Sequence, residues 1–119
     1  MTRRGVLALA LLISAGGSAR ATELTFDLAI VQGRVAEAMR LIRITQGDTV
    51  RLRWTSDRAL NLHLHGYDIE RRVMPGTVAE MTFTARATGR FAIHIHAPDA
   101  PGGPAHDDAP LAVVEVYPR

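Results

Sequence analysis

The chain has 119 residues, a length that allows one globular domain. All 14 of its basic residues are arginines, and they are set against 12 acidic residues. Because the sequence contains no cysteine, it excludes disulfide scaffolds, thiolate metal sites and thiol nucleophiles. A hydrophobic content of 47% and a charged content of 22% are typical of a folded globular protein and exclude a disordered or fibrous chain.

Residues 1–21 have the pattern of a secretory signal peptide. Arg3 and Arg4 precede an apolar stretch over residues 6–13, which is too short to span a bilayer. Small residues then end in Ala19-Arg20-Ala21, an A-x-A cleavage pattern. We predict cleavage after Ala21, a mature domain over residues 22–119, and a periplasmic or secreted location with no membrane span after cleavage. A general export signal and a twin-arginine signal both lead to that location.

The predicted cleavage also changes the charge of the domain. Removing residues 1–21 takes away three arginines and no acidic residue, so the formal net charge falls from +2 to −1. The whole chain has a pI of 9.9, which alone would suit a nucleic-acid-binding protein. The mature domain lacks the excess of positive charge that such binding needs, and we expect no nucleic-acid partner.

Alternating apolar and polar residues predict short β-strands along the mature domain. The strands are expected at residues 23–31, 38–45, 50–54, 60–65, 79–83, 91–96 and 111–117, with a helical turn or two within 35–42. Turn residues separate them, and the Pro- and Gly-rich residues 98–110 predict a long loop. Seven short strands predict an all-β sandwich with one core. The large side chains available to that core are Trp54, Phe26, Phe83 and Phe91.

Four of the five histidines form two H-x-H pairs, His63/His65 and His94/His96. In a strand, side chains at i and i+2 project to the same face, about 6.7 Å apart. If the two strands are neighbours, about 4.8 Å apart, all four rings form one cluster. Imidazole suits Cu(II) or Zn(II), so the pattern favours a metal site. The alternative is that these histidines are solvated polar residues on the outer face of a sandwich.

Other residues are weaker candidates as ligands. His106 lies in the predicted loop, where it can add a ligand or simply be solvated. Met74 and Met81 offer soft sulfur ligands, but Met81 falls in the apolar register and is expected in the core. Three carboxylates are candidates to orient the free ring nitrogens of the ligands: Asp68, Asp107 and Asp108.

The mature domain resembles the cupredoxin-like family over essentially its whole length. The run Gln46-Gly47-Asp48-Thr49-Val50, followed by Leu52 and Trp54, resembles the G-D-x-V strand of that family. Gly89-x-Phe91-x-Ile93 resembles its penultimate strand, and residues 111–117 resemble its final strand. The resemblance implies a cupredoxin-like Greek-key β-sandwich of about seven strands.

Two stretches also resemble the multicopper oxidase domains of the same superfamily. His63-Leu64-His65-Gly66 resembles their H-x-H-G motif, and residues 89–96 resemble their G-x-W-x-F-H-C-H motif. In those enzymes the paired histidines bind a trinuclear copper cluster between domains. The resemblance therefore places four residues of this chain on copper-ligand positions: His63, His65, His94 and His96.

The sequence departs from these families at two positions. Ile95 takes the place of the blue-copper cysteine, and Leu60, beside Asn61, takes the place of the early histidine of that site. The resemblance therefore implies no blue-copper centre and no electron route into a trinuclear cluster. One chain also supplies only two of the several H-x-H pairs that such a cluster needs. No carboxylate base, Ser/His/Asp spacing or phosphate-binding loop accompanies the histidines, so we expect no enzyme activity.

We predict an exported copper-binding protein that acts as a carrier, buffer or assembly factor, with a protein partner in copper handling as a further expectation. The expected metal ligands are His63, His65, His94, His96 and His106, and zinc is the second candidate metal. The alternative is a metal-free cupredoxin-fold module that binds a protein partner. Arginine pairs could form its interaction surface, although a solvated face explains them equally: Arg71 with Arg72, or Arg51 with Arg53.

Overall fold

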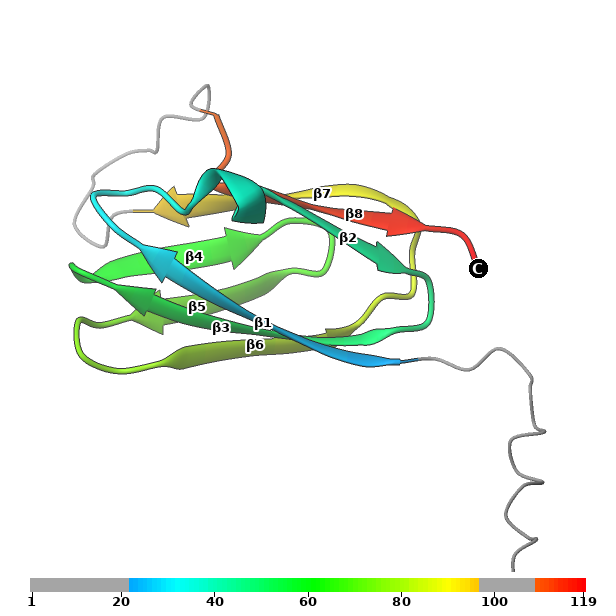
Figure 1. Ribbon diagram of the computed structural model, residues 1–119, viewed down its shortest axis with the longest axis horizontal. Helices are drawn as coiled ribbons and strands as arrows, with labels where there is room; N and C mark the ends of the chain where they lie inside the picture. Colours follow the sequence, from blue (N-terminus) through cyan, green and yellow to red (C-terminus); the bar gives the residue numbers. More distant parts are fainter. Residues whose placement is uncertain (1–21, 97–108) are drawn as a thin grey trace, which may run out of the picture.

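The computed structural model describes residues 22–96 and 109–119. Eight strands and one short 3-10 helix follow one another: β1 (Glu23–Ile30), η2 (Glu37–Met39), β2 (Leu41–Thr45), β3 (Thr49–Ser56), β4 (Leu60–Leu64), β5 (Ile69–Val73), β6 (Ala79–Thr84), β7 (Gly89–His96) and β8 (Ala112–Tyr117) (Figure 1). Within these described ranges, no helix is long and apolar enough to cross a membrane.

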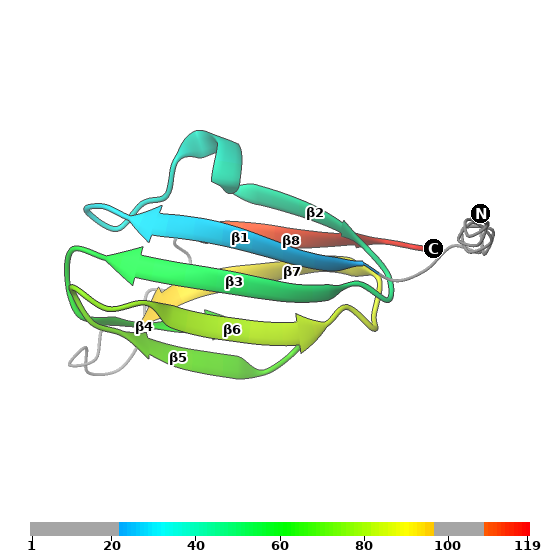
Figure 2. The same ribbon diagram turned by 60° about the horizontal axis from the view of Figure 1, so that its bottom comes forward.

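The strands form two sheets that stack as two layers, as Figure 2 shows. One sheet has three strands in the order β1-β3-β6, and the other has five in the order β2-β8-β7-β4-β5. The pairings of β1 with β3 and of β2 with β8 are parallel. The remaining pairings are antiparallel. The predicted all-β sandwich is confirmed, with one strand more than the seven expected.

The core lies between the two layers, where the apolar face of each strand meets the other sheet. Trp54, Leu62 and Ile93 are completely buried there. Met81 is buried with them, as its register predicted, while Phe91 is half-buried and packs against the core. Burial of apolar surface stabilises the fold by about 25 cal/mol per Å². Because one face of each strand is committed to this core, the alternate residues must point outward.

Strand β5 was not expected from the sequence. Its residues Glu70, Arg71 and Arg72 break the apolar alternation, and four of its five residues are exposed or half-exposed. Arg71 lies opposite the buried Leu62, at a position that faces the interior. Its Nε donates a hydrogen bond of 2.9 Å to the backbone carbonyl of Glu80 on β6, in the other sheet. The Arg71 side chain therefore connects the two sheets at this edge of the sandwich. Because this inward position holds an arginine and not an apolar residue, the sequence pattern did not predict the strand.

The second strand begins at Leu41, three residues later than expected. Glu37–Met39 forms the 3-10 helix η2, in which the Met39 N–H donates to the Ala36 carbonyl at 2.8 Å. The helical turn expected within residues 35–42 is thus present, and it delays the strand. The other predicted strands appear with ends shifted by a few residues at most.

Asp48 anchors the turn between β2 and β3. Its buried carboxylate accepts hydrogen bonds from the backbone N–H groups of Thr22 and Thr45, at 3.1 and 3.0 Å. The guanidinium of Arg119 pairs with the same carboxylate at 2.8 Å. The Gly-Asp turn therefore ties three separate segments together, which gives this part of the G-D-x-V motif a purely structural explanation.

Candidate metal centre

The two H-x-H pairs lie on neighbouring strands, because β4 and β7 pair in the antiparallel sense. His63 lies directly opposite His94, and His96 lies opposite Asn61. His65 follows the last residue of β4, and its N–H donates to the Ala92 carbonyl of β7 at 2.9 Å. Cross-strand partners share a face, so all four imidazoles project from the outer face of the five-stranded sheet. The sequence predicted a four-histidine cluster if the two histidine strands were neighbours, and β4 and β7 are neighbours.

The rings are within contact range of one another. The ring centroids of His63 and His65 are 4.2 Å apart, and those of His63 and His96 are 5.7 Å apart. The rings of His65 and His94 meet edge to face at 5.1 Å. The strands thus gather four of the five predicted ligands at one place. The fifth, His106, lies outside the described residues, as do Asp107, Asp108 and the predicted signal segment 1–21.

A tight turn after His65 fixes the position of the first pair. Gly66 has a φ of +90°, and a Cβ at this position would overlap the ring of Phe91. The adjacent Tyr67 packs against Phe91 with ring centroids 4.9 Å apart. Its hydroxyl donates to the Ala87 carbonyl at 3.1 Å. The glycine of the H-x-H-G run is therefore required by an aromatic residue of the second histidine strand, and the two motifs pack against each other.

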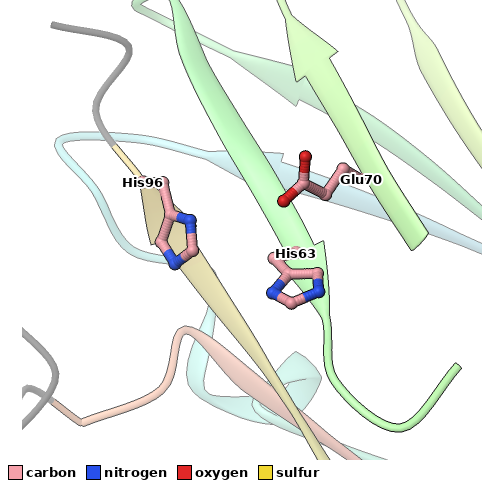
Figure 3. A group of neighbouring side chains, drawn as sticks. All are labelled: His63, Glu70 and His96. Atoms are coloured by element: carbon pink, nitrogen blue, oxygen red, sulfur yellow. The ribbon is translucent and has the colours of Figure 1, made fainter. Parts of the chain in front are cut away.

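A carboxylate that the sequence analysis missed joins the histidines. Glu70 lies on β5 directly opposite His63 on β4. One ligand atom from each of His63, Glu70 and His96 lies within 4.8 Å of the others. Figure 3 shows these side chains on three neighbouring strands, with the Glu70 carboxylate turned toward the side on which the two imidazoles lie. Small adjustments of side-chain torsions would bring these three donors around one ion.

The surroundings of His63 fit a metal ligand. The side chain is 18% exposed, and its Nδ1 atom is buried without a hydrogen-bond partner among the described residues. Its Nε2 atom lies 3.5 Å from Oδ1 of Asp68, which puts this predicted orienting carboxylate beside the ring. An unsatisfied buried polar atom costs about 1–3 kcal/mol, and a metal ion at Nδ1 would remove that cost. In metal-bound histidines, the ring nitrogen that does not bind the metal commonly contacts a carboxylate.

The electrostatics of the cluster favour the neutral form of His65. Partial desolvation lowers the pKa of His65 from its ordinary value of 6.5, and the positive charges of protonated His63 and His96 lower that pKa further. His65 therefore keeps the neutral form, which is the form that binds metals, to a lower pH than a free imidazole does.

The cluster opens into a groove of about 950 Å³. All four clustered histidines line it, together with Glu70 and several residues from other segments: Gly33, Arg34, Val35, Arg40, Ile95, Ala109, Pro110 and Leu111. Ile95, which the sequence resemblance aligns with the blue-copper cysteine, is half-buried and packs against the core. Met74 is 42% exposed and does not line the groove, which removes it as a ligand candidate.

No protein-family model and no curated protein matches the sequence. Solved structures with a similar fold include a multi-copper oxidase from Pseudomonas thermotolerans, with a TM-score of 0.61, 20% identity, and coverage of 83% of this chain and 30% of that one. A blue copper oxidase from Nitrosomonas europaea has a TM-score of 0.59 and 16% identity, with coverage of 82% of this chain and 39% of that one. A copper nitrite reductase from the same organism has a TM-score of 0.57 and 20% identity, with coverage of 82% of this chain and 42% of that one. The chain therefore spans less than half the length of each. Similarity at this level establishes the cupredoxin-like fold.

Proposed function

We propose that this protein is an exported copper-binding protein that carries, buffers or delivers copper and is not an enzyme. The metal lies on the outer face of the five-stranded sheet, held by His63, His96 and Glu70, with His65 and His94 beside them. The observation that carries the proposal is the approach of the three donor groups to within 4.8 Å of one another.

The donor set supports copper as the metal. Nitrogen and oxygen donors without a thiolate suit Cu(II), and among divalent first-row metals such donors generally bind Cu(II) most tightly. The similar solved structures named above are copper oxidases and a copper nitrite reductase, which adds support from the shared fold. A blue-copper centre is excluded because the sequence has no cysteine.

The openness of the site supports transport or buffering. The histidines border a groove and are not enclosed in the core, so an ion can enter and leave without unfolding of the sandwich. Imidazoles bind the ion in their neutral form, and because protons compete with the metal for the ring nitrogens, acidification favours release of the ion.

A titration of the purified protein with Cu(II), followed by calorimetry and visible absorption, tests the proposal. We expect stoichiometric binding with a weak d–d band and no intense thiolate band. The double variant His63→Ala/His96→Ala should bind copper at least about 100-fold more weakly, a loss of about 2.7 kcal/mol. Arg51→Ala/Arg53→Ala, which changes the outer face of the other sheet, is the matched control and should bind normally.

Two results would contradict the proposal. Tighter binding of Zn(II) than of Cu(II) would make zinc the metal. Absence of specific binding of either ion would leave a metal-free module that binds a protein partner as the better explanation.

A further inference from the structure

Two arginines face the groove without a partner. Arg34 and Arg40 line it together with the histidines and Glu70. Both residues are exposed, and within residues 22–96 and 109–119 neither guanidinium makes an ion pair or a side-chain hydrogen bond. Among the described residues the guanidinium groups of Arg72 and Arg86 likewise make no such contact, but neither lines the groove, whereas Arg90, for example, pairs with Glu115 at 2.6 Å. Both residues belong to the segment between β1 and β2, which Figures 1 and 2 place at the end of the sandwich where β7 finishes.

Among the residues that the structure describes, the lining of the groove carries a net positive charge before any metal binds. Its charged lining residues are Arg34, Arg40 and Glu70, which sum to +1 when the histidines are neutral. A bound Cu(II) ion would raise the sum to +3. Guanidinium groups beside a cation site weaken cation binding by themselves, since like charges repel. The arrangement becomes favourable when an anion binds together with the metal.

The coordination of the metal leaves room for such an anion. Three protein donors are fewer than the four or more ligands of a square-planar or tetragonal Cu(II) site, so a ligand from the groove could complete the coordination. A volume of about 950 Å³ is far larger than a water molecule requires and lies within the range of small-molecule sites. Arginine pairs with carboxylates through two parallel hydrogen bonds, which gives the second end of a ligand a defined partner.

We propose that the groove binds copper as a ternary complex with a small carboxylate chelator. Carboxylate oxygens of the chelator complete the coordination of Cu(II), and a free carboxylate oxygen pairs with Arg34 and Arg40. The protein would then exchange copper as an anionic chelate and not as the bare aquo ion. This inference rests on the proposed copper site.

Malonate is a suitable probe, and malonamide is its uncharged counterpart of similar shape. The copper-loaded protein is titrated with each compound, and the Cu(II) electron paramagnetic resonance spectrum is recorded together with the copper that remains bound after gel filtration. We expect malonate to change the spectrum in a saturable manner while copper stays on the protein. Malonamide should bind at least about tenfold more weakly, because it offers no carboxylate either to the Cu(II) ion or to the arginines.

The double variant Arg34→Gln/Arg40→Gln should change the affinities for Cu(II) and for malonate in opposite directions. Without malonate it should bind Cu(II) about two- to fivefold more tightly than the unaltered protein, because two repelling charges are gone. With copper bound, it should bind malonate at least about tenfold more weakly. Arg86→Gln is the matched control, since Arg86 lies in the turn between β6 and β7 at the opposite end of the sandwich (Figures 1 and 2). It should change neither value.

Removal of copper by malonate with no ternary spectrum would overturn the inference, as would equal malonate binding by the double variant and the unaltered protein. In both cases the copper titration itself would still succeed. Failure of the chain to bind copper at all would instead reject the proposed function, so the two failures are distinguishable.

Discussion

The outer faces of the two sheets follow the same alternation of apolar and polar residues, yet their polar residues do different things. On the three-stranded sheet, Arg53 lies 3.7 Å from Asp27 and 3.6 Å from Glu80, and Arg51 lies 3.9 Å from Glu80. These charges compensate one another in a solvated row, where each pair contributes about 0–1 kcal/mol. The arginine pair Arg51/Arg53 is thus explained by a solvated face.

On the five-stranded sheet, the corresponding positions hold imidazoles that face one another. Partial desolvation and, after it, repulsion from His63 and His96 lower the pKa of His65, so the protonated imidazoles do not stabilise one another. The buried Nδ1 of His63 also lacks a hydrogen bond within the described residues. On the charged face, Arg53 Nε also lacks a hydrogen bond within the described residues, but the carboxylates of Asp27 and Glu80 lie within 3.7 Å of it. The two faces therefore differ in what surrounds the unbonded nitrogen: opposite charges on one, and other imidazoles on the other.

The largest effect is expected for Gly66→Ala, which disrupts the histidine face alone. The new Cβ would overlap the ring of Phe91, and the alanine would have to adopt a φ of +90°. We therefore expect the free energy of unfolding to fall by about 3–4 kcal/mol. Gly76→Ala is the matched control, because Gly76 has a φ of +88° with no atom near the added Cβ. It should lose only about 1–2 kcal/mol. Urea unfolding monitored by circular dichroism measures both; equal losses would show that Phe91 does not constrain this turn.

A smaller effect is expected for Glu70→Gln. The amide removes the negative charge but keeps the shape, so Cu(II) affinity should fall about tenfold, or about 1.4 kcal/mol. Glu80→Gln makes the same change on the charged face and should leave copper affinity unaltered. Calorimetric titration compares the two variants. A Glu70→Gln protein with unchanged affinity would remove this carboxylate from the metal site.

The smallest effect concerns the pH dependence of the metal-free protein. The folded-state pKa of His65 lies below its ordinary value of 6.5, so the unfolded chain binds this proton more readily. Stability should therefore fall as the pH drops through about 6.5, and the loss should be complete below the folded-state pKa. His65→Asn should flatten this part of the profile. Thermal melts between pH 8 and 5 provide the test, and identical profiles for both proteins would contradict the assigned pKa shift.

The sequence predicted the fold and most of the histidine geometry because those features follow from local patterns. Period-two alternation identified seven strands, and the i, i+2 spacing of His63/His65 and His94/His96 placed each pair on one face. The sequence analysis missed Glu70 as a ligand because β5 has no apolar alternation and holds Arg71 in the inward position. Treating Gly66 and the residues after it as the turn of a hairpin would have placed Glu70 opposite His63. The parallel pairings of β1 with β3 and β2 with β8 join segments distant in sequence, and no local pattern encodes them.

The most direct test is a crystal structure of the copper-loaded protein with anomalous diffraction data collected at the copper absorption edge. We predict an anomalous peak on the outer face of the five-stranded sheet, within bonding distance of His63, His96 and Glu70. A peak elsewhere on the protein, or no peak after loading with stoichiometric Cu(II), would contradict it.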